Sequence, residues 1–158
     1  MAESRKGTIY YKRSRFLTHL PEGRLYTRSH SWLLEVSLGI WRVGLTKFAS
    51  RMLGDVVEFK ITAVKGDRVS VGQTIGWIEG FKAVSELYCV AEGEFVRGNP
   101  DLDTDITLLD TKPYAEGWLY EVSGRPEPEA TSVADYVALL DVTIDRMIDS
   151  RHDGEHHG

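Results

Sequence analysis

Apolar and polar residues alternate in short runs along most of the chain, up to about residue 122. Residues 30–36 and 40–45 are predicted to be two strands joined by a turn, and residues 55–61 alternate with a period of two over their second half, which predicts a half-buried strand. Glycine-containing turns separate these runs. Many short strands at close spacing are typical of a small barrel or sandwich, so we expect a mainly β fold.

Two segments show helical spacing instead. Residues 46–53 place Phe48 and Met52 on one face, with Thr46 as a plausible N-cap and Gly54 as a plausible stop. Residues 132–150 repeat apolar residues at steps of three and four, which predicts an amphipathic helix. Its start resembles a capping box, since a serine is followed three residues later by a carboxylate. We therefore expect one short helix inserted among the strands and one helix near the C-terminus.

A hairpin is predicted where two apolar runs, residues 75–78 and 87–90, flank a stretch of mostly polar or small residues. Lys82 lies near its tip, and Gly66 and Gly93 mark expected turns on either side. A modifying enzyme can reach a lysine on a tight exposed turn, and the side chain then becomes an uncharged tether. The simpler alternative is a solvated lysine that discourages edge-to-edge pairing of strands.

The pattern divides the chain into five parts. We expect a basic N-terminal extension at residues 1–24, a domain at 25–124, a stiff proline-containing linker at 125–131, the amphipathic helix at 132–150 and a tail at 151–158. The extension has six basic and two acidic residues, a net charge of +4, with three aromatic residues among them. It either packs its aromatic residues on the domain or docks an acidic partner or RNA.

Composition narrows the function classes. Hydrophobic residues make up 42% and charged residues 27% of the 158 positions, as in soluble globular proteins. The net charge of −5 argues against nucleic acid as the main partner, and no apolar run is long enough to span a membrane. We find no secretory signal, and a single cysteine fits a reducing, cytoplasmic compartment.

Neither a metal site nor thiol catalysis is expected. The C-terminal histidines have metal-ligand chemistry but lie at a terminus, where no neighbouring groups are implied to hold them. Cys89 has no basic residue beside it that would stabilise a thiolate, so a buried and inert cysteine is the better interpretation.

Five blocks of residues, in the same order along the chain, resemble the glycine cleavage H-protein family. They are Tyr26 with His30-Ser31-Trp32, Gly44-Leu45-Thr46, Leu53-Gly54-Asp55-Val56-Val57, Glu79-Gly80-Phe81-Lys82-Ala83-Val84-Ser85-Glu86 and Pro113-Tyr114-Ala115-Glu116-Gly117-Trp118-Leu119. The resemblance implies a lipoyl/biotinyl-type barrel-sandwich hybrid. It also implies a covalent cofactor carrier without catalytic residues, with lipoate joined to Lys82 by an amide.

In that family the arm moves an aminomethyl group and reducing equivalents between partner enzymes. The resemblance therefore implies glycine decarboxylase, aminomethyltransferase and dihydrolipoyl dehydrogenase as partners, with a lipoate ligase or lipoyl transferase to attach the group. We expect a monomer. The residues expected around the arm are Glu79, Gly80, Phe81, Ala83, Ser85, Glu86, His30 and Ser31.

Departures from the family pattern leave the cargo open. Ser31 stands where the family has a glutamate that resembles the acceptor of the cargo's amine, and Gly80 and Phe81 stand where serine and valine are usual. H-like lipoate-binding proteins of sulfur-oxidising prokaryotes, which work beside a heterodisulfide-reductase-like complex, are the alternative. A carrier of sulfur intermediates is thus the second hypothesis.

Overall fold

The computed structural model describes the backbone of residues 2–5 and 7–157 and the side chains of residues 7–151. The predicted mainly β fold is confirmed. The strands are β1 (Ala2–Arg5), β2 (Thr8–Arg13), β3 (Phe16–Pro21), β4 (Leu25–Tyr26), β5 (Ser31–Ser37), β6 (Ile40–Leu45), β7 (Val56–Ile61), β8 (Arg68–Val69), β9 (Thr74–Gly80), β10 (Val84–Tyr88), β11 (Ala91–Gly98) and β12 (Tyr120–Pro126). The helices are α1 (Lys47–Leu53), α2 (Asp101–Thr104), α3 (Leu108–Thr111) and α4 (Val133–His157).

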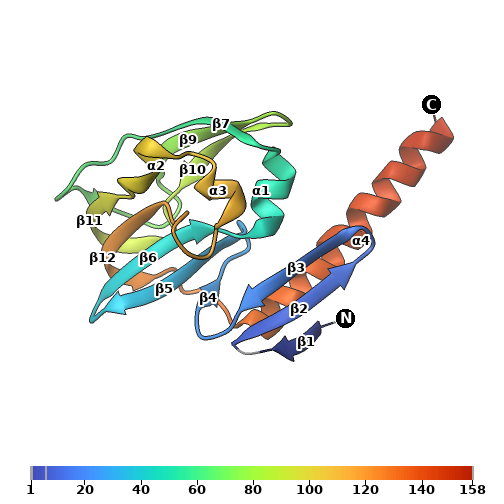
Figure 1. Cartoon of the computed structure of the whole chain (residues 1–158), viewed down its shortest axis with the longest axis horizontal. Coiled ribbons are helices and arrows are strands. Elements are labelled where there is room, and N and C mark those ends of the chain that lie inside the picture. The colour runs from blue at the N-terminus through green and yellow to red at the C-terminus, as the bar shows by residue number, and fades with distance from the viewer. Residues whose placement is uncertain (1, 6, 158) are drawn as a thin grey trace.

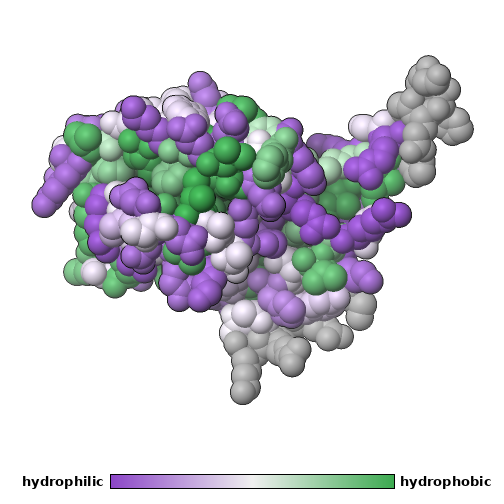
Figure 2. Space-filling view, turned by 45° about the horizontal axis from the view of Figure 1, so that its top comes forward, coloured by the Kyte–Doolittle hydropathy of each residue, from purple (hydrophilic) through white to green (hydrophobic). Residues whose placement is uncertain are grey.

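Two sheets form a sandwich, on the left in Figure 1. One has six strands in the order β4-β5-β6-β12-β11-β8, and the other has three in the order β10-β9-β7. Alternate side chains of both sheets point inward and form the main core, which includes Leu33, Val43, Ile78, Phe95 and Val122. Figure 2 shows a broad hydrophobic area (green) over this sandwich, broken by polar side chains (purple).

The local helix signals are confirmed. Thr46 caps α1, its hydroxyl accepting a hydrogen bond from the amide of Ala49, and Gly54 ends the helix with a positive φ of 75°. The hairpin also forms, as β9 paired antiparallel with β10. Its second strand ends at Tyr88, two residues earlier than expected, because the register shifts between Leu87 and Tyr88 and the next residues turn into the core.

The expected linker is shorter than the sequence indicated. Strand β12 continues to Pro126, and Arg125 and Pro126 pair with Glu92 and Ala91 of β11. The ladder with β6 on the other side of β12 stops at Ser123. A proline is tolerated there because its missing N–H faces no partner strand.

The N-terminal segment is a three-stranded sheet, β1-β2-β3, rather than a plain extension. Tyr11, Phe16 and Leu20 are buried and pack with residues of α4 in a second apolar cluster. Figure 1 shows this sheet lying along the first part of α4. The hydroxyl of Tyr11 donates to Asp141 at 2.7 Å, and the guanidinium of Arg13 binds both carboxylate oxygens of Asp145. The expectation that aromatic residues of this segment pack on the rest of the chain therefore holds for Tyr11 and Phe16.

Helix α4 runs on to His157, so the expected helix end at Ser150 was wrong and residues 151–157 of the expected tail are helical. No proline interrupts this part of the sequence, and one glycine in a helix costs only about 1 kcal/mol.

The side chains of residues 152–158, including the C-terminal histidines, lie outside the described set. Among the side chains that are described, no group of three or more His, Cys, Asp or Glu could hold a metal ion. No described helix has the length and apolar character needed to cross a membrane.

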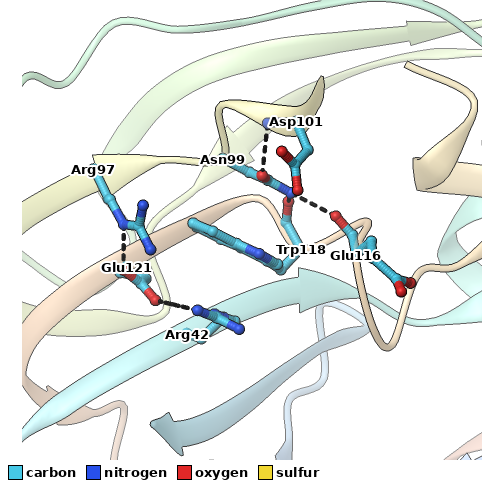
Figure 3. A network of polar contacts seen from close by, with 7 residues as sticks. All are labelled: Arg42, Arg97, Asn99, Asp101, Glu116, Trp118 and Glu121. Carbon is cyan, nitrogen blue, oxygen red and sulfur yellow. Dashed lines mark hydrogen bonds and ion pairs between the residues drawn. The ribbon is translucent and has the colours of Figure 1, made fainter. Parts of the chain in front are cut away.

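A polar network ties β6, β11 and β12 together (Figure 3). The buried carboxylate of Glu121 accepts hydrogen bonds from Arg42 at 3.0 Å and Arg97 at 2.8 Å, and both guanidiniums lie over the ring of Trp118. The side-chain amide of Asn99 donates to the carbonyls of Glu116 and Trp118. The carboxylate is thus paired on both oxygens, which a buried charge requires.

Gly93 lies within β11 instead of at a turn, which corrects the expectation from the sequence.

We predict that Gly93→Ala lowers the free energy of unfolding by about 2–4 kcal/mol. A Cβ there would collide with the backbone of Ser123 and Gly124, and φ is +149°. Gly66→Ala is the control, because φ is +93° but no atom lies within 4 Å, and it should cost about 1 kcal/mol. Urea unfolding of both variants checks this, and equal losses would contradict it.

Candidate functional site

The tip of the β9–β10 hairpin is held by three backbone hydrogen bonds. The amide of Gly80 donates to the carbonyl of Ala83 at 2.9 Å and closes the turn. The amides of Phe81 and Lys82 donate to the carbonyls of Asp55 and Leu53, at 3.1 and 2.9 Å. The tip is therefore attached to the end of α1 and the start of β7, while the side chain of Lys82 is exposed to solvent.

Close contact with α1 explains the glycine at position 80. A Cβ on Gly80 would lie 2.7 Å from the carbonyl carbon of Leu53 and still closer to its oxygen. Real side chains do not approach backbone atoms so closely, so any larger residue would push the tip away from α1. The glycine that departs from the family pattern is thus a packing requirement of this hairpin.

A cleft of about 340 Å³ lies beside the hairpin. Its apolar lining comes from both sheets and from α1: Val43, Leu45, Ala49, Met52, Leu53, Ile78, Ala83, Leu87, Leu119 and Tyr120. Its polar lining comes from the start of β5 and from β10: Ser29, His30, Ser31, Ser85, Glu86 and Tyr88. A mostly apolar cleft with a few polar groups suits a flexible apolar arm that has a polar end.

His30 is fixed in an unusual backbone conformation, with a φ of 65°. Its carbonyl accepts from the amide of Thr46, and its Nδ1 shares a hydrogen bond with the hydroxyl of Tyr136 at 2.9 Å. The ring lies 4.6 Å from the ring of Phe48. Burial lowers the pKa of His30 to about 4, so the imidazole is neutral at neutral pH.

Ser31 and Glu86 are the two cleft residues whose charge bears on the cargo. Ser31 is 7% exposed, and its hydroxyl forms no hydrogen bond with the described residues. Glu86 is the one carboxylate among the lining residues. Its Oε2 accepts hydrogen bonds from the hydroxyls of Tyr88 at 2.9 Å and Thr74 at 3.4 Å. One carboxylate thus lies at the edge of the cleft, on the exposed side of β10, although the position of Ser31 carries no charge.

The structure brings some of the expected site residues together and leaves others apart. His30, Ser31, Ala83, Ser85 and Glu86 line the cleft. Glu79, Gly80, Phe81 and Lys82 belong to the tip instead, and Phe81 is 80% exposed.

Sequence reasoning missed Ser29, Met52 and Tyr88, which also line the cleft. Tyr88 lies two residues after Glu86, so the period of a strand could have indicated it. Met52 was placed on the apolar face of the helix, but nothing in the pattern showed which surface that face meets.

Cys89 is buried, and its thiol donates to the carbonyl of Ala91 at 3.0 Å. Burial raises the pKa of this thiol, which opposes formation of the reactive thiolate. The residue behaves as part of the core, as expected from its neighbours in the sequence.

The sandwich, the anchored tip and the adjacent cleft define a small β-domain that holds an exposed lysine beside a mostly apolar cleft. The model of the family described as Glycine cleavage H-protein matches residues 24–141, and the chain belongs to this family. Members are lipoyl carriers and not enzymes, so the carrier function implied by the sequence is confirmed.

Individual relatives agree with this assignment. The glycine cleavage system H protein of Streptomyces avermitilis is 38% identical over 73% of this chain and 91% of its own length. That of Mycobacteroides abscessus is 35% identical over 82% of this chain and 93% of its own. The crystal structure of a glycine cleavage system H protein from Mycobacterium marinum superposes with a TM-score of 0.67 at 33% identity, covering 75% of this chain and 97% of that chain. The expected lipoyl-type barrel-sandwich fold is confirmed by this likeness.

We predict a pH-dependent stability that originates at His30. The unfolded chain binds a proton on this histidine below pH 6.5 and the folded chain only near pH 4, so stability falls as the pH drops through this interval. The loss amounts to at most about 3 kcal/mol. Urea unfolding at pH 7.0 and 4.5 should give a smaller difference for His30→Asn, because asparagine tolerates a positive φ and does not titrate. Parallel pH profiles of the two proteins would contradict the assignment.

Proposed function

We propose that the chain is the lipoyl carrier of a glycine cleavage system, with lipoate attached to Lys82. The observation that supports this most is the anchored tip, which holds an exposed lysine beside a mostly apolar cleft. The residues fit the group, because the apolar lining would suit its hydrocarbon stem and the few polar lining residues would suit its functional end. Once attached, the group supplies a strained disulfide that opens and re-forms by thiol exchange.

Attachment requires an exposed and well-positioned amine. The deprotonated Nζ of Lys82 attacks the carbonyl of adenylate-activated lipoate, the amide bond forms, AMP leaves and the amine loses a proton. The backbone hydrogen bonds of Phe81 and Lys82 keep the tip in one place during this encounter. Less conformational freedom then has to be lost when the attaching enzyme binds.

The cleft residues give the loaded arm a sheltered position. Leu45, Leu53 and Leu87 would exclude water from the stem, and Glu86 at the edge of the cleft would offer a negative charge to a cationic cargo. A charge-assisted hydrogen bond of this kind is worth about 1.5–3 kcal/mol. Tyr88 orients the carboxylate by donating to Oε2, which leaves the other oxygen for the cargo.

The names of the relatives support glycine cleavage enzymes as partners: glycine decarboxylase, aminomethyltransferase and dihydrolipoyl dehydrogenase. A lipoate ligase or lipoyl transferase attaches the group. The chain acts as a monomer in the cytoplasm, and its single buried free cysteine fits that reducing compartment.

We predict that Lys82 is the sole lipoylation site. The chain is incubated with lipoate, ATP and a bacterial lipoate–protein ligase, and intact mass and peptide mapping locate the adduct. Lys82→Arg should abolish the adduct, because guanidinium is not acylated under these conditions. Lys65→Arg is the matched control, since Lys65 is also an exposed lysine at a turn, and it should be modified like wild type. An adduct on any other lysine would sink the proposal.

Transport of sulfur intermediates is the second candidate, and Ser31 favours it. This buried residue offers the cleft a hydroxyl in place of a carboxylate. A neutral sulfur cargo needs no carboxylate, and a hydroxyl forms a weaker, neutral hydrogen bond. Glu86 is the observation that weighs against this alternative, because it provides a negative charge at the edge of the same cleft.

We predict that cargo retention depends on these two positions. The lipoylated protein is loaded with an ammonium-bearing cargo by glycine cleavage enzymes, and loss of the adduct is followed by mass. Glu86→Gln should speed the loss about 10- to 100-fold, the equivalent of one charge-assisted hydrogen bond. Ser31→Glu should slow it, whereas Ser31→Gln, of the same size but neutral, should not. If Glu86→Gln releases the cargo no faster than wild type, the sulfur alternative becomes the better proposal.

A further inference from the structure

Two apolar side chains stand in solvent on either side of Lys82 and Ala83. Phe81 is 80% exposed and Val84 is 69% exposed. Leaving a phenylalanine in water forgoes about 1.5–3 kcal/mol of burial free energy. The hydrogen bond from the amide of Phe81 to Asp55 fixes its backbone. These residues therefore contribute little to the core, and their exposure needs another explanation.

Three acidic residues are paired or bonded to the backbone around this tip. Glu58 and Glu79 face each other in the ladder between β7 and β9, and Asp55 provides the carbonyl that holds Phe81. Like charges directly opposite each other in a sheet are destabilising. None of the three forms an ion pair with a side chain that the structure describes. We call these five residues the tip patch: Asp55, Glu58, Glu79, Phe81 and Val84.

The length of a lysine side chain indicates that the attaching enzyme, rather than the later enzymes, has to contact the tip patch. From Cα to Nζ an extended lysine reaches about 6 Å, given bonds of about 1.5 Å. An enzyme that acylates this amine must therefore cover the neighbouring residue Phe81. After attachment the arm is roughly twice as long, so later enzymes can work on its end without covering the tip.

We propose that the tip patch is the docking surface for the enzyme that attaches the lipoyl group, and that Phe81 is its principal contact. This rests on the proposal that Lys82 is the attachment site. The matching surface on the enzyme is an apolar pocket for one aromatic ring, surrounded by basic residues that face the three carboxylates. Aromatic anchors in such pockets carry much of the binding energy of interfaces, and surrounding charges raise the rate of encounter.

The test compares attachment rates with later use of the arm. Unlipoylated protein is incubated with a purified bacterial lipoate–protein ligase, lipoate and ATP, and initial rates are taken from intact mass at protein concentrations below KM. Phe81→Ala should lower kcat/KM about 10- to 100-fold, and Phe81→Trp should keep most of it. Leu38→Ala is the matched control, because Leu38 is 97% exposed at the turn between β5 and β6, and it should react like wild type.

The contribution of the carboxylates is tested by measuring attachment at different ionic strengths. The double variant Glu58→Gln and Glu79→Gln should raise KM, and the dependence of its kcat/KM on ionic strength should be weaker than that of wild type. Once fully lipoylated by extended incubation, the arm of Phe81→Ala should be reduced by NADH in the presence of dihydrolipoyl dehydrogenase at the wild-type rate. Circular dichroism confirms that each variant is folded.

Two results would overturn the inference while Lys82 remains the attachment site. One is wild-type kcat/KM for Phe81→Ala, and the other is an equal loss in attachment and in reduction of the loaded arm, which would make Phe81 a general contact. Failure of the ligase to modify Lys82 in the wild-type chain would instead remove the proposed function, and this inference with it.

Discussion

The attachment of the hairpin tip to the end of α1 is the constraint on which the site depends. The carbonyls of Leu53 and Asp55 would be left without partners at the end of a helix, and the amides of Lys82 and Phe81 satisfy them. This pairing places the lysine, brings α1 against the cleft and forbids any side chain at position 80. A carrier needs a rigid hairpin tip at the base of its arm, because only the group attached to the lysine has to move between partners.

Residues 1–23 and 142–158 lie outside the family match, and the first of these segments contains the sheet of β1, β2 and β3. The N-terminal sheet and the distal part of α4 pack on each other through Tyr11, Phe16 and Ile144. This cluster reaches the site through Tyr136, whose hydroxyl bonds both to His30 at the cleft and to Thr46 at the cap of α1, and through Phe48, whose ring contacts those of Phe16 and His30. The added strands and helix thus support the cleft from behind without contributing to its lining.

The departures from the family pattern divide by physical cause. Gly80 is a steric requirement of the contact with α1, while Phe81 is free of any such requirement and faces solvent. Ser31 changes the electrostatics of the cleft, and Glu86 leaves one carboxylate at its edge. Packing therefore explains the first of these substitutions, and only interactions with a cargo or a partner can explain the others.

The local elements of this protein follow from the sequence alone. Strand β6, the cap and stop of α1 and the position of Lys82 on a hairpin depend on periodicity and turn chemistry within a few residues, and all were predicted. The tertiary structure decided which other elements they pair with and pack against. Pairing of the basic N-terminal segment into a sheet, continuation of β12 through Pro126 and entry of Met52 and Tyr88 into the cleft depend on neighbours distant in the chain. A side chain's local pattern shows that it will be buried or exposed, but its partner is chosen only when the two sheets and the helices pack together.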